Sequence, residues 1–245
     1  MPRTVALFSL GGAPGATTAA LALAAVWPGE AVLVEADASG GDVATWQRLQ
    51  PAPGLTGLAA AARHDTASGT APADHTQALP GGLAVCPAPV TAERAGGAVR
   101  LLSQNPSVLL PGTGPATVLD LGRLAPGSPA AALAARADAA LLLVADDVAQ
   151  LRRAKEASAT LAETLPGLRT VVTGGKGGTK EITEALGPGV WGRLPADPRA
   201  AAFLRGEADL RRPHRRPLFR AASRLAADLA ATGTRTEPQL TGAPA

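Results

Sequence analysis

The apolar residues of this chain alternate between short, continuous runs rich in valine and leucine and longer stretches with helical spacing. A continuous apolar run is typical of a parallel strand buried on both faces, and the helices between such runs provide the crossover connections. We therefore expect a doubly wound α/β fold, a mostly parallel sheet flanked by helices in three layers. The predicted strands are Val5–Ser9, Ala31–Glu35, Leu83–Cys86, Ala116–Leu121, Ala139–Ala145, Arg169–Thr173 and Val190–Leu194.

Between these strands the spacing predicts eight helices, and residues 1–231 are expected to form a single domain. Residues 64–82 are polar and rich in Gly, Pro, Ala and Thr, which favours a flexible insertion. Residues 232–245 have the composition of a disordered tail. The predicted helices are Thr17–Val26, Val43–Leu49, Leu55–Arg63, Thr91–Leu102, Pro129–Arg136, Val148–Thr164, Lys180–Leu186 and Leu218–Ala231.

Composition excludes several classes of protein. Hydrophobic residues make up 46% of the 245 residues and charged residues 18%, which is the balance of a globular chain. The single cysteine, Cys86, has no partner for a disulfide, and the three histidines match no metal-ligand spacing. Because no apolar stretch approaches the roughly 20 residues of a membrane span and no signal-peptide cleavage site is evident, we expect a cytoplasmic protein.

The stretch SLGGAPGATT, residues 9–18, has the context of a phosphate-binding loop. It follows a strand, contains Gly11, Gly12 and Gly15, and opens an alanine-rich helix at Thr17 and Thr18. Helix N–H groups at such a point attract anions, and a Ser or Thr in the first turn suits Mg²⁺. A glycine-rich turn without a ligand remains the alternative at this point.

The loop departs from the pattern G-x-x-x-x-G-K-[ST] at two positions. Leu10 replaces the first glycine and Ala16 replaces the lysine, although Gly15 and Thr17 fit. Loss of one charged hydrogen bond in a closed site costs about 1.5 to 3 kcal/mol, or roughly 10- to 150-fold in affinity. Phosphoryl transfer is expected to suffer more, because such cations neutralise charge in the transition state.

Four segments together resemble the MinD/ParA superfamily of deviant-Walker P-loop ATPases. They are SLGGAPGATTAALALA, AVLVEADASGGD, TVLDLGRL and ADAALLLVADDVAQLRRAKE, and the resemblance extends to about residue 205. The resemblance implies a P-loop NTPase-like fold that binds ATP and Mg²⁺. In the family loop K-G-G-x-G-K-[ST]-T, Gly11 takes the place of the signature lysine and Ala16 that of the P-loop lysine, while Ala13 replaces a glycine.

The same resemblance assigns roles to individual residues. It implies a nucleotide-binding loop of Gly11, Gly12, Ala13, Pro14, Gly15, Ala16, Thr17 and Thr18. Asp37 corresponds to the aspartate that positions the attacking water, and Glu35 to the acidic residue before it. Thr17 and Asp120 correspond to the Mg²⁺ ligands. Without the resemblance, these acids would be interpreted as helix caps or solvated turn residues.

Two basic residues are candidates to replace the missing lysine charge. Arg123 follows the Asp120 strand, and Lys176 lies in GGKGGTK, which we interpret as a mobile loop. In the family the signature lysine reaches the partner's phosphates across a dimer, so Gly11 argues against an ATP-switched dimer. A constitutive homodimer through the same face stays open.

A basic segment lies near the C-terminus. Between residues 205 and 224, seven arginines face two acidic residues, a net charge of +5 against +3 for the whole chain. Such a segment attracts DNA phosphates or an anionic membrane surface. The alternative is a last helix packed on the sheet with its arginines in solvent. The residues assigned to this basic patch are Arg211, Arg212, Arg215, Arg216, Arg220 and Arg224.

These features lead to one functional prediction and one alternative. We expect an ATP-binding protein with a degenerate site and weak Mg-ATP binding. It would act with protein partners as a localisation or scaffolding factor, similar to the TadZ/CpaE-like proteins of pilus assembly, or in positioning at the cell pole or septum. The alternative is a slow but active ATPase of the partition type that binds DNA, or lies peripherally at the inner face of the membrane, through the basic segment.

Overall fold

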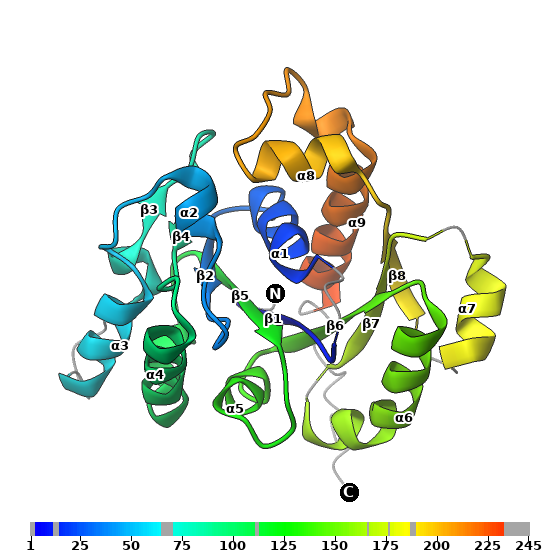
Figure 1. Cartoon of the computed structure of the whole chain (residues 1–245), viewed down its shortest axis with the longest axis horizontal. Helices are drawn as coiled ribbons and strands as arrows, with labels where there is room; N and C mark the ends of the chain where they lie inside the picture. Colours follow the sequence, from blue (N-terminus) through cyan, green and yellow to red (C-terminus); the bar gives the residue numbers. More distant parts are fainter. Residues whose placement is uncertain are drawn as a thin grey trace, which may run out of the picture.

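The computed structural model of the chain describes residues 3–11, 15–64, 71–110, 113–165, 167–175, 177–186 and 190–232. Within these residues one sheet has the strand order β3-β4-β2-β5-β1-β6-β7-β8 (Figure 1). Its neighbours pair in parallel, except that β3 runs antiparallel to β4. The strands are β1 (Thr4–Ser9), β2 (Ala31–Glu35), β3 (Gln77–Ala78), β4 (Ala84–Cys86), β5 (Ala116–Arg123), β6 (Ala139–Ala145), β7 (Arg169–Thr173) and β8 (Val190–Leu194).

Helices cover both faces of the sheet and complete three layers. In Figure 1, α1 and α9 lie on one side of the sheet and α4, α5 and α6 on the other. Two apolar clusters match this division. The first packs α3 to α7 on one face, and the second packs α1, α2, α8 and α9 on the other. The helices are α1 (Ala16–Ala25), α2 (Val43–Gln47), α3 (Leu55–His64), α4 (Ala92–Gln104), α5 (Pro129–Ala134), α6 (Val148–Thr164), α7 (Thr179–Leu186), α8 (Pro198–Leu204) and α9 (Pro217–Thr232).

The central strands are buried on both faces, as their continuous apolar sequences require. Every residue of β1 is buried, as are all but the last residues of β5 and β6. The helix α1 is buried from Ala19 to Ala24, and its small side chains let it pack closely against β5, α8 and α9. An apolar, small-residue helix is what a position between a sheet and other helices demands.

The predicted α/β fold is confirmed, and the bounds of four strands agree with the prediction at both ends. The structure differs in part of the 64–82 segment, which was expected to be flexible throughout. There Pro72–His75 form a 3₁₀ turn, and β3 adds an antiparallel edge strand, whose two residues are too short for a periodic signal. The helix α8 was also missed. The predicted tail overlaps the described residues only at Thr232, the last residue of α9, and residues 233–245 lie outside them.

The sheet brings the predicted site residues to one edge. In the strand register, Asp120 of β5 is paired with Leu7 of β1 on one side and Glu35 of β2 on the other. Parallel strands place their carboxyl ends together, and the loop after β1 begins at the same edge. The three predicted acids and the phosphate-binding loop are therefore neighbours in space.

Candidate functional site

The described part of the predicted phosphate-binding loop is Gly11 and residues 15–18. Gly15 is left-handed (φ 81°, ψ 40°) and caps α1 without a side-chain hydrogen bond. A side chain at this φ would be strained, which accounts for glycine. The α1 N-terminus thus presents its first backbone N–H groups without a side-chain cap, an arrangement that favours an anion. Gly12, Ala13 and Pro14 lie outside the described residues.

Asp120 is fully buried at the base of this loop. Its Oδ1 accepts a hydrogen bond from the Gly122 N–H (3.1 Å), whereas Oδ2 has no hydrogen-bond partner within the described part of the chain. Burial raises the pKa of Asp120 to about 6, and the nearby Thr17 hydroxyl and the Gly122 N–H act in the opposite direction. A buried carboxylate oxygen that lacks a hydrogen bond of normal length is costly, so Asp120 is a candidate to hold a cation.

Asp37 lies beside Asp120, over Gly122 near the end of β5. Its Oδ1 accepts the Ser39 N–H at 2.7 Å, and its carboxylate lies against the α-carbon of Gly122. Burial raises the pKa of Asp37, an effect that the Ser39 hydrogen bonds and the positive charge of Arg123 oppose. Arg123, one of the two cations proposed from sequence, therefore lies close enough to Asp37 to act on its charge.

The Glu35 carboxylate is held by backbone hydrogen bonds and has a structural role. Its Oε1 accepts the N–H groups of Asp42 (2.7 Å) and Val43 (3.0 Å) at the start of α2, and its Oε2 accepts that of Ala88 (2.9 Å). Burial raises the pKa of Glu35 to about 7, against the lowering effect of these hydrogen bonds. With both oxygens occupied by backbone donors, Glu35 holds α2 to the end of β4 and leaves Asp37 as the acid facing the site.

The helix α2 continues this connection to α8. Its last residue, Gln47, donates a hydrogen bond from Nε2 to the Leu204 carbonyl oxygen (2.7 Å). A Cβ at Gly206 would lie within 3.4 Å of the Trp46 carbonyl oxygen and of the Gln47 amide, so the turn after α8 packs on the end of α2. One short helix thus spans from Glu35 to the beginning of the basic segment.

A cation that sequence reasoning missed lies at the phosphate-binding loop. The Arg153 guanidinium, from α6, covers Gly11 so closely that a Cβ there would lie 3.0 Å from Cζ and overlap Nη1. A sequence signal was present, because α6 follows β6, the neighbour of β1, and so begins at the edge where the loop lies. Arg153 contacts the position where the family pattern has its signature lysine.

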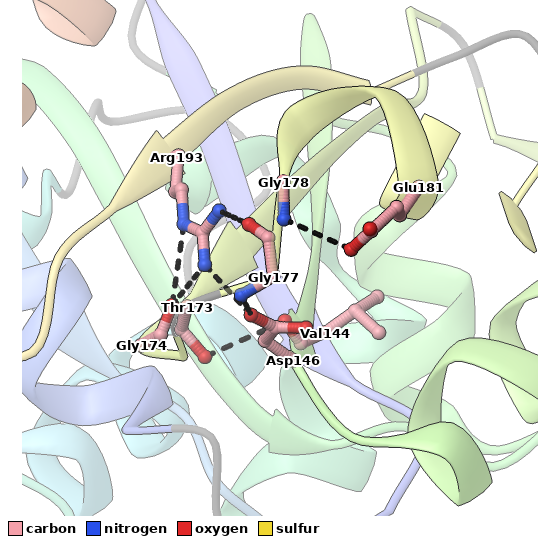
Figure 2. Close-up of polar contacts among 8 residues, drawn as sticks. All are labelled: Val144, Asp146, Thr173, Gly174, Gly177, Gly178, Glu181 and Arg193. Carbon is pink, nitrogen blue, oxygen red and sulfur yellow. Dashed lines mark hydrogen bonds and ion pairs between the residues drawn. The ribbon is translucent and has the colours of Figure 1, made fainter. Parts of the chain in front are cut away.

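A second network of hydrogen bonds holds the loop between β7 and α7, as Figure 2 shows. Arg193 of β8 donates to the carbonyl oxygens of Gly174 (2.8 Å) and Gly177 (2.6 Å), and it forms an ion pair with Asp146 (2.7 Å). The Gly177 N–H also donates to Asp146 Oδ2 (2.9 Å). The described residues of the loop are therefore held by several hydrogen bonds, in contrast to the mobile loop expected from its glycines. Lys176 lies outside the described residues.

The basic segment is only partly available to a ligand. Arg216 forms an ion pair with buried Asp197, which also caps α8 through the Ala200 N–H (3.1 Å), and Arg205 is paired with Glu207 (2.7 Å). The remaining arginines of the predicted patch are exposed on the 211–215 segment and on α9: Arg211, Arg212, Arg215, Arg220 and Arg224. Among the residues predicted for the patch, Arg216 has its guanidinium occupied by Asp197, a pair that joins α8 to α9.

A large cavity among the described residues is distant from the phosphate-binding loop. It measures about 800 Å³ and lies between the C-terminal half of α1, the β3–β4 hairpin and residues 203–214. Residues of the basic segment thus line this cavity next to the C-terminal end of α1, the end far from Thr17. No helix in the described ranges has the length and apolar character to cross a membrane.

Comparisons by sequence identify no relative of the chain. No protein-family model matches it. No curated protein matches it either.

Comparisons by structure do find similar folds. The ParA family ATPase from Chlorobium tepidum TLS is 15% identical with a TM-score of 0.71, covering 93% of this chain and 99% of that one. The Pyrococcus furiosus cell division ATPase MinD is 17% identical, also with a TM-score of 0.71, over 95% and 100%. The septum site-determining protein MinD complexed with Mg-ADP from Pyrococcus horikoshii OT3 is 14% identical with a TM-score of 0.69, over 96% and 98%. The chain therefore has the fold of the MinD and ParA ATPases.

Proposed function

We propose that the chain is a MinD/ParA-like protein that binds a magnesium nucleotide weakly at the loop between β1 and α1. The observation that carries the proposal is the buried Asp120 carboxylate, which lies beside the Thr17 hydroxyl at the start of α1 and whose Oδ2 makes no hydrogen bond of normal length in the described ranges. A helix N-terminus for the phosphates and a carboxylate for the metal are the two elements that such a ligand needs. Similar folds include a MinD complexed with Mg-ADP.

The donor set fits Mg²⁺. Thr17 and Asp120 would hold the ion through a hydroxyl and a carboxylate oxygen, both hard ligands of the kind that Mg²⁺ prefers. Among the described residues no cluster of three or more His, Cys, Asp or Glu side chains is suited to a metal. The remaining ligands would thus come from phosphates and water, which is usual for Mg²⁺ in nucleotide sites. When bound, the ion neutralises phosphate charge.

The proposed binding is weak because both lysine positions of the loop are uncharged. Ala16 opens α1 and Gly11 follows β1, so neither gives a cation to the phosphates. The α1 N-terminus without a side-chain cap lets affinity survive at a reduced level. We propose that hydrolysis is slow or absent, with Asp37 as the residue that would orient water, and that the protein acts as a localisation or scaffolding factor within a larger assembly.

A titration of fluorescent ATP, with and without Mg²⁺, tests the binding. Wild-type protein should bind more tightly with Mg²⁺, and Asp120→Asn should abolish that difference by removing the metal's carboxylate. Asp209→Asn is the matched control, because Asp209 is exposed and lines the cavity at the other end of α1. Failure of the wild-type protein to bind ATP at millimolar concentration would refute the proposal.

A second candidate function is that of a slow partition-type ATPase that binds DNA or an anionic membrane. It is favoured by the five exposed arginines of the basic segment. Phosphate release should then rise when DNA or anionic vesicles are added. Replacing Arg211, Arg212 and Arg215 with alanine should weaken binding and lower its salt dependence by about 0.9 in log–log slope for each phosphate that the variant no longer neutralises. Binding that ignores salt would exclude this function.

A further inference from the structure

Arg153 occupies the space next to the phosphate-binding loop that a larger residue at position 11 would fill. Its guanidinium reaches the loop from the second turn of α6, and the absence of a side chain at Gly11 allows this approach. Gly11 is buried, and its φ lies outside the left-handed region, so its own backbone conformation does not require glycine. The glycine and the arginine therefore fit each other: one provides room and the other fills it.

Arg153 has no counter-charge in the described ranges. It forms no hydrogen bond or ion pair with any described residue. Its side chain is exposed, and its guanidinium contacts the backbone of buried Gly11. Two other arginines near this edge of the sheet are engaged, Arg193 by Asp146 and two carbonyl oxygens, and Arg123 electrostatically by Asp37. A guanidinium held against a loop without an acidic partner is available to an anion.

We infer that Arg153 binds the phosphate groups of the nucleotide and supplies, from α6 of the same chain, the positive charge that the loop itself lacks. This inference rests on the proposed function, because it names a phosphate ligand of the same site. A guanidinium presents a planar fork of donors that suits bidentate contact with phosphate oxygens. It also acts in cis, so nucleotide binding requires no second copy of the chain.

The experiment compares Arg153→Ala with Arg152→Ala in titrations of fluorescent ATP and of inorganic tripolyphosphate. Arg152 is the matched control, since it is exposed and adjacent on α6 and has no contact with Gly11. Arg153→Ala should lose roughly 10- to 150-fold in affinity for both probes, the effect of one charged hydrogen bond. Arg152→Ala should stay within about twofold of wild type, as surface substitutions do.

A position swap separates the direct role from an indirect one. In the Arg153→Ala background, Gly11→Lys places a cation in the vacated space and should restore much of the lost affinity. Thermal unfolding of each variant checks that the fold is retained. Equal affinities of wild type and Arg153→Ala for both probes would overturn the inference and leave the nucleotide site standing. If the wild-type protein binds neither probe, the proposed function fails, and the inference fails with it.

Discussion

The Asp37 carboxylate lies against the α-carbon of Gly122, and a Cβ at that position would overlap Cγ and Oδ2 of Asp37. Gly122 is also left-handed (φ 57°). Gly122→Ala should therefore lower the free energy of unfolding by about 2 to 4 kcal/mol, from backbone strain of about 1 to 2 kcal/mol together with steric displacement of Asp37. Urea denaturation measures this loss.

Gly127→Ala is the control for the backbone contribution. Gly127 is left-handed as well (φ 72°), but a Cβ there would meet no atom within 4 Å. It should cost only the strain of about 1 to 2 kcal/mol. Equal losses in the two variants would show that Asp37 does not constrain position 122.

Glu35 makes the stability of the protein depend on pH. Burial raises its pKa from 4.5 to about 7, so the folded state binds a proton more tightly than the unfolded state. Its contribution is fully present below pH 4.5 and is lost as the pH rises to about 7, a fall of about 3 kcal/mol in the free energy of unfolding. Asp120, with its pKa raised to about 6, acts in the same direction at lower pH.

Urea denaturation between pH 5 and pH 8 tests the contribution of Glu35. Glu35→Gln should flatten the fall in stability, while the exposed Glu30→Gln should keep the wild-type profile. The slope carries the test, because an amide also places an N–H group near the Ala88 donor and lowers stability at every pH. A variant with an unchanged slope would exclude Glu35 as the source.

Arg193 should be required for order in the loop that follows β7. Its guanidinium donates to two carbonyl oxygens and one carboxylate, a pattern that a lysine ammonium cannot reproduce. Both Arg193→Ala and Arg193→Lys should speed amide hydrogen exchange at Gly174 and Gly177, because the free energy of local opening falls by about 1.5 to 3 kcal/mol. Lys180→Ala, which removes an exposed pair with Glu184, should leave that exchange unchanged.

Arg216 should contribute to folding, in contrast to the other arginines of the basic segment. It pairs with Asp197, and although burial raises the pKa of that carboxyl, Arg216 and the Ala200 N–H bring it below its ordinary value. Arg216→Ala should lower the melting temperature, and Asp197→Ala should cost about 0.5 to 2 kcal/mol for the lost helix cap alone. Arg215→Ala, at an exposed position, should leave the melting temperature at the wild-type value, and a loss equal to that of Arg216→Ala would contradict this assignment.

Sequence patterns predicted the helices and strands that carry a clear apolar pattern of their own. The bounds of β6 and α6 were predicted at both ends, because each carries its own apolar period. The edge strand β3 could not be found in this way, since two residues carry no period and its pairing with β4 is a tertiary contact. The resemblance assigned Asp37 and Asp120 to one site, and the pairing of Asp120 with Glu35 brings Asp37, two residues further on, to the same edge of the sheet.

The cations of the site were harder to predict, because their roles depend on side-chain direction. Arg123 and Lys176 were proposed from their predicted positions in the chain, whereas Arg153 reaches the loop from the second turn of α6. The charge of Arg216 likewise indicated a binding surface until Asp197, 19 residues earlier, proved to be its partner. Composition reports how many charges a segment has, and only the packed structure reports which of them are neutralised.

The short helix α2 has a mechanical consequence. At its start, the N–H groups of Asp42 and Val43 donate hydrogen bonds to Glu35. At its end, the Gln47 side chain donates a hydrogen bond to the Leu204 carbonyl oxygen. The hydrogen bonds of Glu35 therefore fix both ends of the loop that contains Asp37. The five residues of α2, about 7.5 Å long, connect this loop to the turn after α8, where the basic segment begins. A displacement of Asp37 therefore requires that α2 move with it or that these hydrogen bonds break. If α2 moves, the turn after α8, where the basic segment begins, moves as well.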